Sequence, residues 1–123
     1  LAIIDSTVVR SHACSTGYGR QEHEALGRSA GGLSTKIHAR VDALGNPLKI
    51  ILTPGNYHDI TQAKRLSEGV FDIPLAGDKE YSSKNFDDFL HVRGCEPIIP
   101  SKSNSKNHRS YDKHLYKERH LIE

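Results

Sequence analysis

Residues 35–55, "TKIHARVDALGNPLKIILTPG", form two arms of alternating apolar and polar side chains on either side of the turn residues "LGNP". On each arm the apolar residues line up: Ile37, Ala39 and Val41 share one face, and Leu48, Ile50 and Leu52 share another. Alternation with a period of two is typical of half-buried strands, and a short turn between two such arms predicts an antiparallel hairpin. An isolated hairpin is at best marginally stable, so the flanking segments must supply further strands and a core.

Residues 1–9, "LAIIDSTVV", are rich in β-branched residues and predict a buried strand that Asp5 interrupts. Residues 10–34 contain five of the ten glycines and show no sustained period, so they predict a long Gly-rich loop. Long loops inside a compact domain are usually functional or disordered.

After the hairpin, helical and strand patterns alternate. Asp59 stands where an N-cap is expected, with Gln62 as its capping-box partner, and the apolar spacing that follows predicts a helix up to Gly69. The short apolar run at residues 73–78, "IPLAGD", predicts a buried strand that ends on Asp78.

The remaining segments complete the pattern. Residues 82–94 predict a second amphipathic helix, residues 96–101 an edge strand between prolines, and residues 101–110 a basic loop, before a terminal helix that ends in residues 116–123. Three leading antiparallel strands followed by alternating helix and strand predict a mixed α/β (α+β) fold with a ribonuclease-H-like arrangement. It has a central mixed sheet of about five strands and helices on its faces.

The size and composition favour a single domain spanning residues 1–123. No apolar run approaches the roughly 20 residues of a membrane span, and no charged leader or cleavage site precedes the first strand. We therefore expect a cytoplasmic protein that does not engage membranes. Cys14 and Cys95 lack the spacing of a zinc site or disulfide framework, so both are expected to be reduced.

The basic residues gather near the C-terminus. Residues 101–110, "SKSNSKNHRS", carry three cations, no anion and no large apolar side chain. This composition is typical of an exposed loop that could contact phosphates, and equally of a solvated surface loop.

Asp5 and Asp78 both stand in strands predicted to be buried. Two neighbouring buried carboxylates repel each other unless a cation lies between them, and Mg²⁺ is commonly held by one or two carboxylates. The terminal helix offers a third acid, either Glu118 or Glu123. Glu123 shares a helix face with Tyr116 and Arg119, which favours Glu123. The alternative is that the two aspartates only cap turns and that Glu123 is an exposed chain end.

At these positions the chain resembles the catalytic domain of bacterial insertion-sequence transposases of the DDE type. The resemblance lies in "IDSTVVRSH" (4–12), "ALGRSAGGLSTKIHARVDALGNPLKIILTPGNYHD" (25–59), "AGDKEYSS" (76–83), "IIPSKSN" (98–104) and "YDKHLYKERHLIE" (111–123). The last segment is similar to the family signature Tyr, two residues, Arg, three residues, Glu, six residues, Lys. Tyr116, Arg119 and Glu123 match it, and the lysine would fall seven positions after Glu123.

The resemblance implies that Asp5, Asp78 and Glu123 are the catalytic acids and hold two Mg²⁺ or Mn²⁺ ions. It implies hydrolysis at the ends of an insertion sequence and transfer of the freed 3′ ends to target DNA, with no other cofactor and no small-molecule substrate. The partners would be both DNAs and further copies of the chain in a homo-oligomer. The candidate DNA contacts are Tyr116, Arg119, Lys79, Lys102, Lys106, Arg109 and Arg10.

Relative to the family pattern, we expect a domain that is truncated at its C-terminus and lacks an N-terminal region for recognising DNA ends. Two other functions remain open at this point. The chain could be a transposase remnant that binds DNA with weak catalysis, or a ribonuclease-H-like nuclease that cleaves without strand joining.

Overall fold

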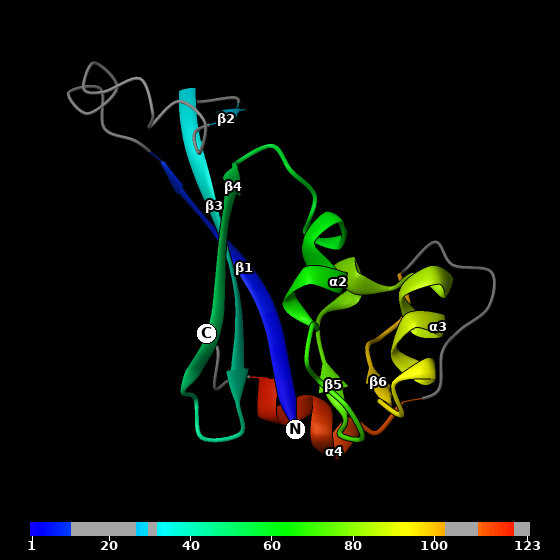
Figure 1. Cartoon of the computed structure of the whole chain (residues 1–123). Helices are drawn as coiled ribbons and strands as arrows, with labels where there is room; N and C mark the ends of the chain where they lie inside the picture. Colours follow the sequence, from blue (N-terminus) through cyan, green and yellow to red (C-terminus); the bar gives the residue numbers. More distant parts are fainter. Residues whose placement is uncertain (11–26, 30–31, 103–110, 120–123) are drawn as a thin grey trace.

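The computed structural model describes residues 1–10, 27–29, 32–102 and 111–119 (Figure 1). Several predicted features lie outside these ranges: most of the Gly-rich loop with Cys14, residues 103–110 of the basic loop, and residues 120–123 of the terminal helix.

A mixed sheet forms the centre of the molecule. Its strands are β1 (Ala2–Arg10), β2 (Gly27–Ser29), β3 (Gly32–Asp42), β4 (Pro47–Pro54), β5 (Leu75–Ala76) and β6 (Pro97–Ile98). The order is β2-β3-β1-β5-β6, with β4 also paired to β3. β1 runs antiparallel to β3 and parallel to β5, and β5 runs parallel to β6. The predicted mixed sheet and the ribonuclease-H-like fold class are confirmed.

The boundaries of three predicted segments were wrong. The predicted loop at residues 10–34 contains β2 and the beginning of β3, and β1 extends to Arg10. These strand residues were missed because "GRS" and "GLS" contain glycine and serine, whereas long β-branched or aromatic side chains mark strands. The predicted strands at residues 73–78 and 96–101 shorten to β5 and β6, with two residues each.

The predicted antiparallel hairpin is confirmed as β3 and β4. Its register pairs Ile37 with Leu52 and Ala39 with Ile50, so the apolar residues of both arms lie on the same face of the sheet and not on two different faces. On β4 this face is open, because Leu48, Ile50 and Leu52 each expose more than half of their surface.

The helical segments are short. They are η1 (Asp59–Gln62), α2 (Ala63–Leu66), η2 (Lys79–Tyr81), α3 (Lys84–Val92) and α4 (Lys113–Lys117). The predicted second helix is α3, and the Ser83 hydroxyl caps it by accepting a hydrogen bond from the Phe86 backbone N–H. The described part of the terminal helix is α4, which Asp112 caps.

The predicted capping box at Asp59 was wrong. His58 is the N-cap of η1, and no side chain caps this helix. The predicted single helix up to Gly69 is instead the 3₁₀ segment η1 followed by α2. The Asp59 carboxylate is free to face the sheet because it does not bind the helix N-terminus.

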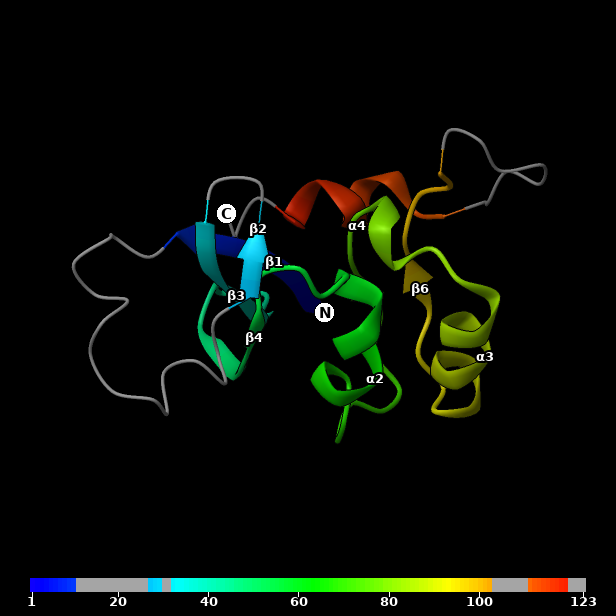
Figure 2. The same cartoon turned by 90° about the horizontal axis from the view of Figure 1, so that it is seen from above.

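Helices cover both faces of the sheet (Figure 2). On one face α2 and α3 bury the larger cluster, which consists of Ala2, Ile4, Ile51, Ala63, Leu66, Val70, Leu75, Tyr81, Phe86, Leu90, Cys95 and Ile99. On the other face α4 packs Leu115 and Tyr116 against a smaller cluster of Ile3, Val41, Ala76 and Ile98. Alternate residues of β1 therefore belong to opposite cores, as expected for a central strand.

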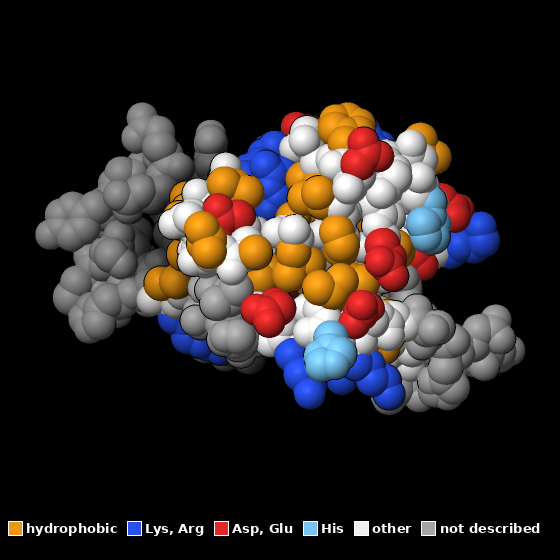
Figure 3. All heavy atoms as spheres, turned by 90° about the horizontal axis from the view of Figure 1, so that it is seen from below, with side chains coloured by type: hydrophobic (Ala, Val, Ile, Leu, Met, Phe, Trp, Pro, Cys, Tyr) orange, Lys and Arg blue, Asp and Glu red, His pale blue; other side chains and the backbone are white. Residues whose placement is uncertain are grey.

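The end of the molecule seen from below shows hydrophobic side chains gathered across its middle, bordered by acidic and basic groups (Figure 3). None of the helices in the described ranges is long and apolar enough to cross a membrane.

Two neighbouring residues of β4 test the assignment of its faces. Ile51 is 6% exposed and Ile50 is 59% exposed. Ile51→Ala should lower the free energy of unfolding by about 2–5 kcal/mol because it leaves a cavity in the larger core. Ile50→Ala should change it by no more than about 0.5 kcal/mol. Urea unfolding of both variants measures the difference, and equal losses would contradict the register.

Candidate active site

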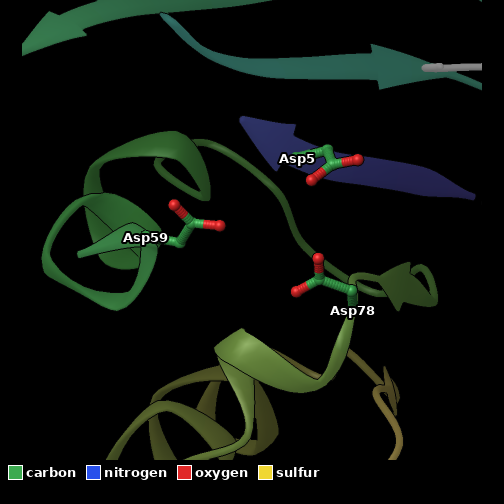
Figure 4. Close-up of side chains that lie close together, drawn as sticks. All are labelled: Asp5, Asp59 and Asp78. Atoms are coloured by element: carbon green, nitrogen blue, oxygen red, sulfur yellow. The ribbon is translucent and has the colours of Figure 1, made fainter. Parts of the chain in front are cut away.

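Three aspartates from distant parts of the chain meet beside the middle of β1, just past the end of β5. Asp5 lies on β1, Asp59 begins η1, and Asp78 follows β5. Each offers a carboxylate oxygen, and these oxygens all lie within 4.8 Å of one another. Figure 4 shows the three side chains directed into a common space.

Strand register explains why Asp5 and Asp78 meet. β1 and β5 are parallel neighbours in which Ala2 pairs with Leu75 and Ile3 pairs with Ala76. Asp5 and Asp78 each follow the last of these paired residues by two positions, so they occupy equivalent register positions, Asp5 within β1 and Asp78 just past the carboxyl end of β5. The sequence prediction that these two acids come together is consistent with this geometry.

Asp59 was missed as a member of the group. Its Oδ1 accepts a hydrogen bond from the Ser6 hydroxyl at 2.6 Å and pairs with the Lys36 ammonium at 3.0 Å. Lys36 also donates to the Tyr57 carbonyl at 2.6 Å, which holds the segment before η1 against β3. The sequence carried no signal of this contact, because Lys36 occupies an ordinary polar position of an alternating strand.

Gly77 allows the close packing beneath Asp78. A Cβ at this position would lie 2.9 Å from the Tyr81 ring and 3.3 Å from the Ile4 side chain. Tyr81 is fully buried, and the short helix that contains it begins where the Asp78 carboxylate accepts the Glu80 backbone N–H at 3.0 Å. The position of Asp78 therefore depends on the packing of Tyr81.

Arg119 closes the site from the opposite face of the sheet. Its guanidinium pairs with Asp5 Oδ2 at 3.2 Å and lies 5.5 Å from the centroid of the Tyr116 ring. Tyr116 in turn packs edge-on against Tyr111, with ring centroids 5.5 Å apart. Arg119 and Tyr116 were predicted to contact DNA. In this structure Tyr116 packs on the smaller core and Arg119 binds a carboxylate.

The other predicted site residues are more scattered. Lys79 is exposed directly after Asp78, and Arg10 and Lys102 are exposed at the end of β1 and after β6. Glu123, Lys106 and Arg109 lie outside the described residues.

Burial dominates the electrostatics of the cluster. It raises the pKa of Asp5, against the opposing effects of the Ser6 N–H and of Arg119. Burial likewise raises the pKa of Asp78, and the nearby Asp5 and Asp59 carboxylates add to this increase, whereas the Glu80 N–H opposes it. Both carboxylates would hold their negative charge more easily with a further cation beside them.

The group fits a hard divalent cation. In octahedral Mg²⁺ sites the ligand oxygens lie about 2.1 Å from the ion, so opposite ligands are about 4.2 Å apart. Adjacent ligands of such an ion are about 3.0 Å apart, and the three aspartate oxygens lie within 4.8 Å of one another, so they are near enough to share one ion. Among the described residues, Lys36 pairs with Asp59 and Arg119 pairs with Asp5. These two positive charges leave one of the three negative charges without an ion-pair partner in the described part of the chain.

Comparison with known proteins agrees with this site. The family model for the transposase DDE domain matches residues 1–122. The chain belongs to this family. Its function is DNA transposition, and DDE transposases are polynucleotidyl transferases that use divalent metal ions.

Two proteins similar to this DDE domain support the assignment. A Brucella ovis protein assigned as a transposase for insertion sequence element IS6501 is 36% identical over 96 residues, which are 74% of this chain and 72% of the relative. A cryo-EM structure of the piggyBac transposase synaptic complex with hairpin DNA matches with a TM-score of 0.57 at 13% identity. The match covers 90% of this chain and 26% of the piggyBac chain, and it supports the fold alone.

Gly77→Ala tests how Asp78 is positioned. The added methyl group must displace the Tyr81 ring, which should lower the free energy of unfolding by about 1–3 kcal/mol. Chemical denaturation of Gly77→Ala alone and in a Tyr81→Leu background measures this cost. The cost should be smaller in the Tyr81→Leu background, and an equal cost would show that the ring is not the obstacle.

The raised pKa of Asp78 predicts a dependence of stability on pH. Below about pH 4 the carboxyl is protonated in both the folded and the unfolded chain, and stability falls as the pH rises through the higher folded-state pKa. Asp78→Asn should therefore raise the melting temperature in metal-free buffer by about 3 °C at pH 7, with no gain near pH 3.

Asp42 supplies a control of opposite sign. Hydrogen bonds from the Asn46 and Leu44 backbone N–H groups lower the pKa of Asp42. Its ionised form therefore stabilises the fold above the unfolded-state pKa. Asp42→Asn should lower the melting temperature at pH 7 and lose this effect in acid. The same sign for both variants would contradict the electrostatic assignment.

Proposed function

We propose that this domain hydrolyses a phosphodiester at the ends of an insertion sequence and transfers the freed 3′ end to target DNA. Asp5, Asp78 and Glu123 would hold two Mg²⁺ or Mn²⁺ ions for both steps. The observation that carries the proposal is the placement of Asp5 and Asp78 at equivalent register positions of adjacent parallel strands, with their carboxylate oxygens within 4.8 Å of each other.

The chemistry requires fixed anionic oxygens around a space open to a DNA strand. When bound, divalent ions supply Lewis-acid activation of the attacking oxygen and stabilisation of the leaving one. Asp78 is held by its hydrogen bond to the Glu80 N–H, and Asp5 by the Ser6 N–H at 2.8 Å and by Arg119. These contacts orient the carboxylates before a cation arrives, which reduces the ordering cost of binding.

DNA contacts are proposed for the described basic residues from their position and exposure and, for Lys106 and Arg109, which lie outside the described residues, from the sequence alone. Lys79 is adjacent to Asp78 and exposed, so its ammonium can reach a phosphate at the site. Arg119 would exchange its contact with Asp5 for a phosphate contact beside Tyr116. We assign weaker, peripheral phosphate contacts to Arg10, Lys102, Lys106 and Arg109. The active form would be a homo-oligomer that holds two DNA ends in the cytoplasm.

The decisive experiment supplies Mn²⁺ and a labelled insertion-sequence end together with a target duplex. Asp5→Asn and Asp78→Asn should each reduce cleavage and joining by at least about 100-fold, because each removes a proposed metal ligand. Asp88→Asn, which alters an exposed aspartate paired to Lys84, should retain activity.

The products distinguish the possible functions of the domain. Joined strands support transposition as proposed. Cleavage of arbitrary DNA without joining would instead indicate a nuclease, and binding without cleavage would indicate an inactive remnant. Undiminished cleavage by Asp78→Asn would contradict the assignment of the site.

A further inference from the structure

We propose that Asp59 is a further carboxylate ligand of the divalent cation site and that Lys36 is its counter-ion. The proposal rests on the proposed metal-dependent function and adds a residue to the Asp5, Asp78 and Glu123 set. It assigns to Asp59 a role other than the capping of η1, since its carboxylate caps nothing in this structure.

The two carboxylate oxygens of Asp59 have different environments. Oδ1 is engaged by the Ser6 hydroxyl from β1 and by the Lys36 ammonium from β3. Among the described residues, no donor binds Oδ2. The side chain is only 12% exposed. Two strands of the sheet therefore hold one oxygen of a carboxylate that belongs to the cluster, while the other oxygen has no donor among the described residues. A ligand fixed in this way is preorganised for a cation.

The Tyr81 side chain gives a second observation in favour of a ligand near the three acids. Its hydroxyl is buried and has no hydrogen-bond partner of good geometry among the described residues, although Tyr81 is completely inaccessible to solvent. Tyr81 ends the short helix η2, which Asp78 caps, so it lies beside the group of acids. Burial and the Asp59, Asp5 and Asp78 carboxylates raise the pKa of its hydroxyl, and the Ser6 hydroxyl opposes this increase. A buried hydroxyl without a hydrogen-bond partner is costly, so a water or oxygen ligand near it would relieve that cost.

The charges favour a ligand over a purely structural ion pair. A structural pair would need only Lys36 and Asp59. Here Asp59 also lies against Asp5 and Asp78, and the repulsion among the three is costly without a cation in the middle. Asp5 has both oxygens engaged, by the Ser6 N–H and by Arg119, so Asp59 Oδ2 is one of the more available oxygens in the group.

Mn²⁺ binding tests this without any enzymatic readout. The ion alone is titrated into the chain, and the free ion is followed by its electron paramagnetic resonance signal. Asp59→Asn should weaken Mn²⁺ binding by about 30-fold, within the range found when residues that support a metal site are removed. Asp88→Asn is the matched control, because Asp88 also pairs with a lysine at 3.0 Å but lies on the surface. It should bind as the unsubstituted chain does.

A second variant, Lys36→Gln, tests the proposal independently in the same Mn²⁺ titration. Glutamine keeps a hydrogen-bond donor for Asp59 but removes a positive charge near the cation, so Mn²⁺ should bind about fivefold more tightly. A lysine that only anchors the loop through Asp59 and Tyr57 would give the opposite result, with weaker or unchanged binding.

The outcomes separate this inference from the proposed function. A loss in Asp59→Asn that is larger than the gain in Lys36→Gln supports direct ligation, since a through-space charge effect alone would make the two comparable. A loss no larger than that gain overturns the inference, as does weaker or unchanged binding in Lys36→Gln. If Asp5→Asn weakens binding but Asp59→Asn does not, only this inference fails. If the unsubstituted chain binds no Mn²⁺, the proposed metal site fails with it.

Discussion

Repulsion among three partly buried carboxylates is the constraint on which the rest of the structure depends. Asp5, Asp59 and Asp78 converge from a strand, a helix start and a strand end, and each has a different compensation. Lys36 comes from β3, Arg119 follows α4, and the Glu80 N–H comes from η2. Elements on both faces of the sheet thus supply charges or donors to one small volume. Because desolvation still raises the pKa of Asp5 and Asp78, these partners reduce the cost of burial without removing it.

The packing of the two cores serves the same site. On β1, Ile4 packs in the larger core and Ile3 packs in the smaller core. Asp5 is the next residue of the strand. On the smaller core, Leu115 and Tyr116 hold α4 against the sheet, which brings Arg119 within 3.2 Å of Asp5. On the other side, the Tyr81 ring fills the space that Gly77 leaves beside Ile4. A change in either core should therefore move a residue that touches the carboxylates, so stability and site geometry are linked.

Asp5 and Asp78 were predictable from sequence because a carboxylate within an apolar strand is a local anomaly that one sequence can reveal. The order of the elements predicted a mixed sheet, and the structure adds the parallel pairing of β1 and β5 that brings the two acids together. Asp59 was not predictable in this way, since an aspartate before a helical pattern has a common local explanation as an N-cap. What overrode that explanation is a contact between residues far apart in the chain, from Asp59 to Lys36 and Ser6. The β2 strand was missed for a different reason, because its "GRS" sequence has low strand propensity although the segment pairs with β3.

Lys36 and Arg119 also bear on how the site would work. Each binds one oxygen of a carboxylate that faces the cluster, so each lowers the repulsion that would otherwise oppose folding without metal. The same positive charges must oppose an incoming divalent cation, because they compete for the same negative field. A site compensated by two fixed cations therefore gains stability without metal and loses some affinity for it. Under the proposed function Arg119 would resolve this conflict when DNA binds, since a phosphate would offer its guanidinium a bidentate partner and free Asp5 Oδ2 for the metal. In this arrangement substrate and cation would bind cooperatively, with Arg119 as the group that passes from one to the other.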